Sequence, residues 1–387
     1  MTDSEFSLEK FDVSEKTGFV PEEPPLRRLA DETFERWEEV MARLPALIKS
    51  GQLRVEVDRL PDVECSEKTL KTEREWWRAH NLITIITQSY IWMEGEKGLV
   101  YKIPKKLAVP WNEVSKHLEL HPVATYANLV LQNYFLNDPQ GSHSESNIST
   151  ASTFTGTDDE RWFFKVHVLV EIAAATGLKA MVGAHKAIAR KDNKALAAEL
   201  QNITSSLCGM KDAMNKMFDS CDPQTFYVKM RQFYAGSKGL DAFPNGLIYE
   251  GVDSSPLKFN GASGGESSAI YSFDIFLGVQ HDSAFVGEMM DYMPNKHRQF
   301  LDALSRQPSV REYVAGSGNA DAIANYNKAI DAFVEFRSNH IIVVTRYIVS
   351  QKKYSVNSSL EDTGTGGTEF MPFLKKLRDE TLSLKIA

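Results

Sequence analysis

The sequence ADAIANYNKAIDAFVEFRSNHIIVVTRYIVS, from Ala320 to Ser350, decides the fold class because it predicts one long core helix. It contains neither proline nor glycine, and it follows the helix-breaking residues GSGN at 316–319. Apolar residues recur at the three- and four-residue spacing of a buried helical stripe, at Ile323, Ile330, Phe333, Val334, Ile341, Val344 and Tyr347.

Two polar residues interrupt this apolar stripe. Arg337 and His340 are three positions apart, so they project from the same helical face. Each needs a partner there, because an unpaired buried charge is costly. One reading is a core histidine bonded to a backbone carbonyl and an arginine paired with a carboxylate. The other is an imidazole that ligates a metal or haem iron, with the guanidinium neutralising a cofactor carboxylate. Helical spacing alone does not choose between them.

The rest of the chain predicts an all-α fold with two bodies. Segments in which apolar and polar residues alternate, as in a β-strand, are scarce, and VEVDRL from Val55 is the only candidate. Short helices are expected at 111–118 and 122–135. A polar run rich in Ser, Thr and Gly then separates the apolar helical patterns. We therefore expect a smaller, mostly helical N-terminal domain at 1–145, a linker at 146–160, and a large helical domain at 161–387.

Composition excludes several classes of function. The net charge of −8, from 44 basic and 52 acidic residues, argues against a nucleic-acid or membrane surface as the main role. The three cysteines are not closely spaced, which suits a reducing compartment, and no Cys-x-x-Cys-His occurs. We see no signal peptide and no run of about eighteen apolar residues. We expect a cytoplasmic protein without a membrane span.

Among the nine histidines, only His167 and His340 lie within strongly apolar helical stretches. Two such histidines on separate helices are what a haem held between helices would display, although either one alone is more often a core residue. No HExxH motif occurs, so a zinc hydrolase has little support. We expect the remaining histidines at the surface: His80, His117, His121, His143, His185, His281 and His297.

A series of motifs along the chain decides among these readings. They are SGQLR (50–54), RWFFKVHVLVEIAAA (161–175), GLIYEGV (246–252), GASGGESS (261–268), YMPNKHRQFL (292–301), PSVREYV (308–314), RSNHIIVVTRYI (337–348) and GTGGTEFMPFLK (364–375). In this order, they resemble the indoleamine 2,3-dioxygenase family. The resemblance implies a large haem-binding domain whose distal pocket is covered by the smaller N-terminal domain.

The resemblance also implies a cofactor and a reaction. His340 would be the proximal ligand of a non-covalent haem b, and Arg337 would meet a haem propionate. Asp274 matches a position near that arginine, unless it is an ordinary surface acid. Ferrous haem, O2 and L-tryptophan would give N-formylkynurenine, the first step of the kynurenine pathway. An external electron donor would keep the haem ferrous, and we expect a monomer.

Further residues match substrate-binding positions of the family. Phe163, with Phe164 beside it, would pack on the indole ring, and Tyr126 would line the indole pocket. Phe226 would supply an aromatic wall, and Arg231 would grip the substrate carboxylate. Ser263 would contact a propionate or the substrate, and Thr365 would bind the amino-acid group. Without the resemblance, these would be a surface arginine, core aromatic residues and two connecting loops.

His167 departs from the family pattern, because mammalian members have a serine at this position. Its imidazole could accept a hydrogen bond from the indole N–H, donate one to the dioxygen, or ligate iron. We expect the hydrogen bond from the substrate. Two other functions stay open: a related haem enzyme that oxidises another indole derivative as a monooxygenase, and a non-catalytic haem protein that binds oxygen.

Overall fold

The structure is a computed structural model that describes residues 6–280, 284–361, 364–365 and 370–387. Helices dominate it, and the described residues form only two two-stranded sheets. The prediction of an all-α fold is confirmed.

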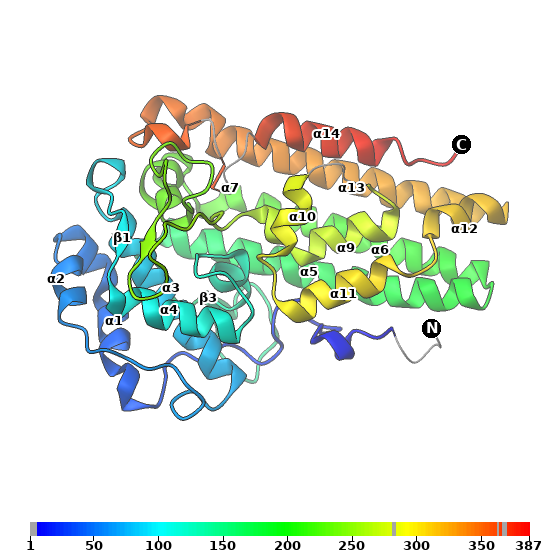
Figure 1. Ribbon diagram of the computed structural model, residues 1–387. Helices are drawn as coiled ribbons and strands as arrows, with labels where there is room; N and C mark the ends of the chain where they lie inside the picture. The colour runs from blue at the N-terminus through cyan, green and yellow to red at the C-terminus, as the bar shows by residue number, and fades with distance from the viewer. Residues whose placement is uncertain (1–5, 281–283, 362–363, 366–369) are drawn as a thin grey trace.

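Four helices of the N-terminal part pack together in blue and cyan in Figure 1: α1 (Glu35–Lys49), α2 (Leu53–Asp58), α3 (Glu73–Trp92) and α4 (Lys105–His117). Helix α3 is the core of this body, since most of its residues are buried. It begins at a capping box in which Thr72 and Glu75 satisfy each other's backbone N–H groups. Two short turns precede the four helices, η1 (Glu9–Phe11) and η2 (Glu32–Phe34), and η3 (Glu96–Gly98) follows α3.

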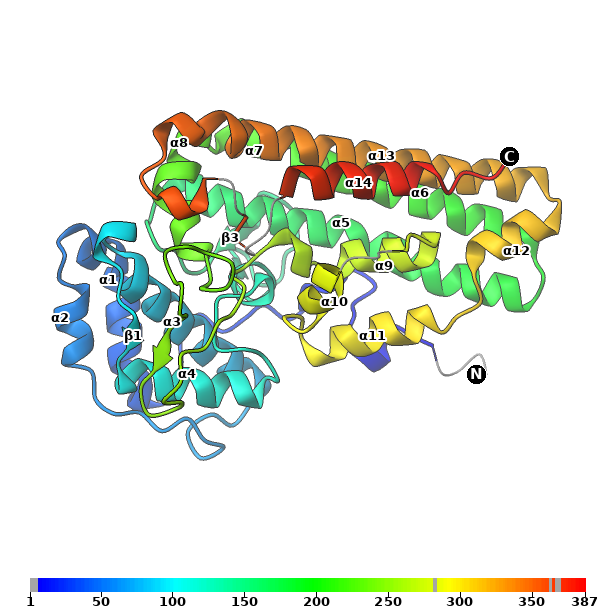
Figure 2. The same ribbon diagram turned by 45° about the horizontal axis from the view of Figure 1, so that its top comes forward.

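Long helices form the second body and run side by side in Figures 1 and 2: α5 (Asp158–Ala189), α6 (Asn193–Asn215), α13 (Ala320–Tyr347) and α14 (Phe370–Leu382). Helix α13 is the long helix that the sequence predicts over 320–350. Shorter helices flank this bundle: α7 (Met217–Ser220), α8 (Pro223–Thr225), α9 (Ser268–Leu277), α10 (Ala284–Met290), α11 (Asn295–Ser305) and α12 (Val310–Ser317).

Helical turns of non-α geometry lie around the bundle. Two are π-helices, η4 (Ala127–Leu131) and η5 (Phe226–Met230). The others are the 3-10 turns η6 (Arg231–Tyr234), η7 (Gly264–Glu266), η8 (Val349–Tyr354) and η9 (Ser358–Leu360).

Both sheets are short. Strand β1 (Lys102–Ile103) pairs in parallel with β4 (Ile248–Tyr249), with Lys102 opposite Ile248. Strand β2 (Tyr134–Leu136) pairs antiparallel with β3 (Ile148–Thr150), with Phe135 opposite Ser149. The first sheet joins the N-terminal body to the irregular, glycine-rich segment that precedes α9.

Two expected helices differ from the structure, and the one candidate strand is helical. The strand-like sequence VEVDRL lies mostly in α2, because Leu53 and Val57 are buried at helical spacing. The helix expected at 111–118 begins at Lys105 and continues through Pro110. The helix expected at 122–135 is replaced by η4 and β2, because the backbone of Tyr134–Leu136 bonds to β3 instead.

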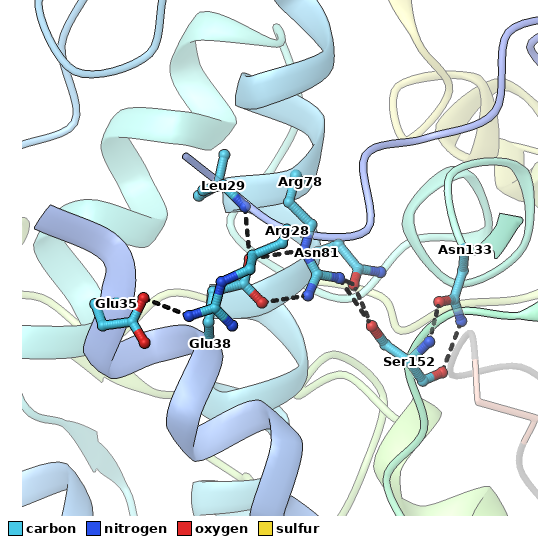
Figure 3. A network of polar contacts seen from close by, with 8 residues as sticks. All are labelled: Arg28, Leu29, Glu35, Glu38, Arg78, Asn81, Asn133 and Ser152. Atoms are coloured by element: carbon cyan, nitrogen blue, oxygen red, sulfur yellow. Dashed lines mark hydrogen bonds and ion pairs between the residues drawn. The ribbon is translucent and has the colours of Figure 1, made fainter. Parts of the chain in front are cut away.

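The segment expected to be a linker, residues 146–160, makes buried hydrogen bonds to the N-terminal helices. Ser152 is buried, and its hydroxyl accepts from Arg78 at 3.2 Å and donates to Asn81 at 2.8 Å (Figure 3). Arg78 in turn forms a buried ion pair with Glu38 of α1. Asn133 bonds to the backbone N–H of Ser152 at 2.8 Å and to its carbonyl at 3.0 Å. The division into two domains stays a prediction, but residues near 152 are part of a packed polar network.

Helix α5 is long and apolar enough to cross a membrane by length and composition alone, although we expected no such segment from the sequence. In the structure, 61% of its most apolar stretch is buried against protein. A core helix of a helical bundle has the same properties.

Candidate functional site

All the residues that the sequence proposes for the site line one cavity of about 290 Å³. Its walls are mainly apolar and aromatic. The proposed residues are Tyr126, Phe163, Phe164, His167, Phe226, Arg231, Ser263, Asp274, Arg337, His340 and Thr365. They come from distant parts of the chain, so the fold, and not sequence proximity, brings them together.

His340 presents its imidazole to this cavity from α13. Its ring makes no hydrogen bond to any residue that the structure describes, so the carbonyl partner of an ordinary core histidine is not found there. Burial, together with smaller effects of the nearby His167 and Arg337, lowers the pKa of His340 to about 4. The imidazole is therefore neutral at pH 7 and keeps a lone pair available for a ligand.

Arg337 has a carboxylate partner in the same cavity wall. Its guanidinium forms a buried ion pair with Asp274 of α9 and lies 4.3 Å from the centre of the Phe333 ring. Asp274 is only 3% exposed, so it is not a surface acid. The pair meets the requirement that a buried charge be compensated.

His167 lies on α5, and its hydrogen bonding defines its tautomer. Nδ1 is 2.8 Å from the carbonyl oxygen of Phe163, one turn earlier. Because a carbonyl only accepts, Nδ1 must carry the hydrogen and Nε2 must be the acceptor nitrogen. Burial also lowers the pKa of His167, which favours this neutral form.

Aromatic rings surround Phe163 and form one wall of the cavity. Its ring centre is 4.3 Å from that of His167 and 5.0 Å from that of Phe226. Tyr234, which the sequence analysis missed, stacks on Phe163 at 5.6 Å with an interplanar angle of 10°. Tyr126 approaches His167 edge-on at 6.2 Å. The cavity thus offers flat apolar surface beside one acceptor nitrogen.

Arg231 and Phe226 reach the same cavity because the helix between them is not an α-helix. Residues five apart point roughly 140° away from each other on an α-helix at 100° per residue. Phe226–Met230 is instead a π-helix, whose bonds join residues five apart. The sequence pattern gave no sign of this turn.

The Arg231 side chain is 2% exposed and donates to the carbonyl of Leu360. Its guanidinium carbon lies 5.3 Å from the centre of the Tyr227 ring. Burial lowers the pKa of Arg231 to about 10, so the group still carries its charge at pH 7. It is a buried cation at a cavity and not a surface arginine.

The two glycine-rich loops meet beside the cavity. The Thr365 hydroxyl donates to the carbonyl of Ala262 at 2.7 Å, and the Thr365 backbone carbonyl accepts from the N–H of Gly261 at 3.2 Å. Gly261 has no room for a side chain, since an added Cβ would lie 2.2 Å from the carbonyl of Tyr234. Residues 366–368 of the GTGGT motif lie outside the described residues.

The segment before Thr365 is attached to the N-terminal body through Glu96. Its carboxylate accepts from the hydroxyl of Ser358 at 3.1 Å, and from the N–H and hydroxyl of Ser359, both at 3.1 Å. Its backbone N–H donates to Asn357 at 2.8 Å. Nothing in the sequence around Glu96 predicts this attachment.

Other histidines correct the sequence analysis. His80, His185 and His297 are buried, although we expected them at the surface. None of the three lines the cavity, and all pack against aromatic rings. His281 lies outside the described residues. Polar neighbours in sequence therefore failed to predict exposure.

The donor set decides what kind of group the cavity could hold. Within the described ranges, no cluster of three or more His, Cys, Asp or Glu side chains could hold a bare metal ion. A metal ligated by His340 would need its other ligands from a macrocycle. Haem fits these residues, because it offers apolar faces for the aromatic walls and carboxylates for Arg337. The helical fold and the apolar, aromatic cavity fit a protein that would enclose a planar prosthetic group.

Comparison with known proteins gives the family. The profile described as "Indoleamine 2,3-dioxygenase" matches residues 7–384. Indoleamine 2,3-dioxygenase 2 of Mus musculus is 40% identical, over 97% of this chain and 95% of the relative. Indoleamine 2,3-dioxygenase 1 of Rattus norvegicus is 38% identical (97% and 94%), and indoleamine 2,3-dioxygenase of Saccharomyces cerevisiae is 32% identical (97% and 93%). The chain belongs to the indoleamine 2,3-dioxygenase family and is an oxidoreductase.

Proposed function

We propose that this enzyme opens the indole ring of L-tryptophan with both atoms of O2 and releases N-formylkynurenine, with haem as its cofactor. The observation that carries the proposal is the convergence on one cavity of eleven residues at positions that match the family, His167 being the one that departs in residue type. The chain matches the family over residues 7–384, so no part of that cavity falls outside the match. When bound, haem supplies the oxygen chemistry, and the protein supplies ligation, orientation and a dry pocket.

In this proposal, His340 would ligate the iron of a non-covalent haem b. Its neutral ring and lack of a described hydrogen-bond partner support that role. Arg337, with Asp274 beside it, would hold a propionate. The Asp274 carboxylate balances the guanidinium before the propionate arrives, so Arg337 need not be buried as a lone charge.

Substrate binding divides between a charged and an aromatic part of the cavity. Arg231 would bind the carboxylate of L-tryptophan with two parallel N–H groups. Phe163 and Phe226, 5.0 Å apart between ring centres, would enclose the indole ring with Phe164 and Tyr126. Thr365 and Ser263 would bind the amino-acid group and the haem edge.

His167 would accept a hydrogen bond from the indole N–H. Nδ1 already donates to the Phe163 carbonyl, which leaves the lone pair on Nε2. A donor role for Nε2 would require the opposite tautomer and the loss of that hydrogen bond. The geometry therefore supports an acceptor at this position, where mammalian members have serine. We further propose a cytoplasmic monomer that depends on an external electron donor.

The test is an absorption spectrum of the purified protein, ferric and ferrous, with and without L-tryptophan. We expect a haem spectrum that L-tryptophan perturbs, and a product that carries two labelled atoms after turnover under labelled O2. A product with one labelled atom would support a monooxygenase instead. A ferrous spectrum unaffected by L-tryptophan would favour a non-catalytic oxygen-binding protein. A colourless protein after expression with ample haem would overturn the proposal.

A further inference from the structure

Glu171 is a buried acid next to the cavity, and neither haem binding nor substrate binding as proposed involves it. It lies on α5 one turn after His167 and is 1% exposed. It does not line the cavity itself, but it contacts two residues that do, Tyr126 and Ser267.

One oxygen of the Glu171 carboxyl group makes both of these contacts. Oε1 accepts from the Tyr126 hydroxyl at 3.0 Å and from the Ser267 hydroxyl at 2.6 Å. Oε2 is buried without a hydrogen-bond partner among the described residues. Burial accordingly raises the pKa of Glu171 to about 7. A half-satisfied buried acid is unfavourable for stability, so its presence points to a role in the neighbouring site.

A second buried carboxylate holds the backbone of the same tyrosine. Glu266 Oε2 accepts from the N–H of Tyr126 at 2.6 Å, and its Oε1 accepts from the N–H of Ser263 at 2.9 Å. The backbone and the phenol of Tyr126 are therefore fixed separately. Of the two acids, Glu171 is the one that controls where the phenol ring lies.

The fixed ring borders the proposed indole pocket. Tyr126 comes from the N-terminal half of the chain, directly before η4, while Glu171 and His167 share one face of α5. The Tyr126 ring, whose hydroxyl donates to Glu171, lies edge-on to His167 with 6.2 Å between ring centres. Without this hydrogen bond, the ring could turn away, because the Glu266 contact restrains only the backbone.

We propose that Glu171 is a positioning residue for the substrate pocket: by accepting from the Tyr126 hydroxyl, it sets the separation between the aromatic wall and the His167 acceptor. The inference rests on the proposed function, since it names the residue that shapes the same pocket. It predicts an effect on the binding of L-tryptophan and none on the binding of haem, because Glu171 contacts no residue assigned to the haem.

The test compares Glu171→Leu, Glu171→Gln, Tyr126→Phe and the double variant Glu171→Leu/Tyr126→Phe as ferrous holoenzymes titrated with L-tryptophan. Loss of the hydrogen bond between Tyr126 and Glu171 predicts an affinity for L-tryptophan about two- to tenfold weaker in Glu171→Leu and in Tyr126→Phe. The double variant should bind L-tryptophan no more weakly than Glu171→Leu does, because that change already removes the Tyr126–Glu171 hydrogen bond that Tyr126→Phe removes. Glu171→Gln keeps an acceptor oxygen and should retain the affinity of the wild type.

Steady-state kinetics separate positioning from a general loss of structure. We expect KM to rise in Glu171→Leu while haem content stays at the wild-type level and kcat changes less than KM. Rescue by Glu171→Gln is the second criterion, because a role in charge balance would not be restored by an amide.

Any of three results would overturn this inference without affecting the proposed function. The first is an unchanged affinity of Glu171→Leu for L-tryptophan. The others are a loss of affinity in the double variant equal to the product of the two single losses, or a Glu171→Gln variant that binds as weakly as Glu171→Leu. If Glu171→Leu does not fold, Tyr126→Phe decides the question, since it removes the same bond and leaves the acid in place; unchanged affinity there refutes the proposal. Failure of the wild-type holoenzyme to bind L-tryptophan would instead overturn the proposed function, and this inference with it.

Discussion

His167 and His340 face the same cavity from two different helices, α5 and α13, and lie close enough for His167 to lower the pKa of His340. Burial acts on both rings in the same direction, so both are neutral at pH 7. One imidazole has no described hydrogen-bond partner, while the other has its tautomer set by the Phe163 carbonyl. The two histidines are thus suited to different tasks, ligation for His340 and acceptance of a hydrogen bond for His167.

Replacing His340 by alanine should abolish stable haem binding. No other residue in the described part of the chain offers a comparable imidazole to the cavity except His167, which is bonded to Phe163. The measurement is the haem-to-protein ratio after purification. His117→Ala, an exposed histidine outside the cavity, is the matched control and should keep the wild-type ratio. Normal haem content and turnover in His340→Ala would refute the assignment of the axial ligand.

Arg231→Leu should mainly weaken L-tryptophan binding. Loss of a charge-assisted contact costs about 1.5–3 kcal/mol, or roughly ten- to hundredfold in affinity. Arg231→Lys should recover only part of this, because an ammonium group cannot form two parallel bonds to a carboxylate. Lys229→Leu, an exposed residue two positions away, is the control. Equal affinity of the Arg231→Leu and wild-type enzymes would remove Arg231 from the site.

His167→Ala should slow turnover while haem is retained, because the substrate loses its acceptor. The readout is kcat/KM for L-tryptophan and for an analogue methylated on the indole nitrogen, which has no N–H to donate. The wild type should discriminate between the two substrates more strongly than the variant does. A variant that turns over L-tryptophan faster than the wild type would show that the side chain obstructs the pocket.

Glu171 should make stability depend on pH. Burial raises its pKa from 4.5 to about 7, so between these values the folded protein holds a proton that the unfolded chain has released. The free energy of unfolding therefore decreases as pH rises through this window, by up to about 3 kcal/mol. Glu171→Gln does not titrate and should gain stability relative to the wild type between pH 5 and pH 8.

Urea unfolding of both proteins at the two pH values measures this difference. Glu266 is also buried and also has a raised pKa, but it is present in both proteins, so its contribution cancels in the comparison. A stability difference that is the same at pH 5 and pH 8 would contradict the raised pKa of Glu171.

Breaking the buried ion pair between Arg78 and Glu38 (Figure 3) should lower the free energy of unfolding more than breaking an exposed ion pair does. Arg78→Met leaves a buried carboxylate without its cation, and we expect a loss of about 3–5 kcal/mol in the free energy of unfolding. The double variant Arg78→Met/Glu38→Leu should recover much of it. Lys16→Ala, which breaks an exposed pair with Glu22, should cost no more than about 1 kcal/mol. A loss in Arg78→Met as small as that in Lys16→Ala would contradict this account.

The sequence predicts the long helices well because their apolar spacing is strong and their ends carry caps. Helix α13 was expected over 320–350 and spans Ala320–Tyr347, after Asn319 as its cap. Short segments were less predictable. VEVDRL satisfies both strand and helix patterns, and only packing of Leu53 and Val57 selects the helix. The π-helices left no periodic signal at all.

The residues of the site could be predicted from the sequence, but the distances between them depend on the fold. Spacing placed Arg337 and His340 on one face, but the cavity and the Asp274 partner depend on α9. Glu171 was overlooked although a signal existed, since it is a lone acid within the apolar run VLVEIAAA. Like His340, Glu171 is a polar residue that interrupts an apolar helical stretch.

The bonds of Glu96 to Ser358 and Ser359 join parts of the chain that are 262 and 263 positions apart. A truncated enzyme that starts at α5 would therefore lose Glu96 as well as the N-terminal helices that lie over the cavity. The segment leading to Thr365 would lose the acceptor that anchors it, so truncation from the amino end should damage the carboxyl-terminal wall of the site as well.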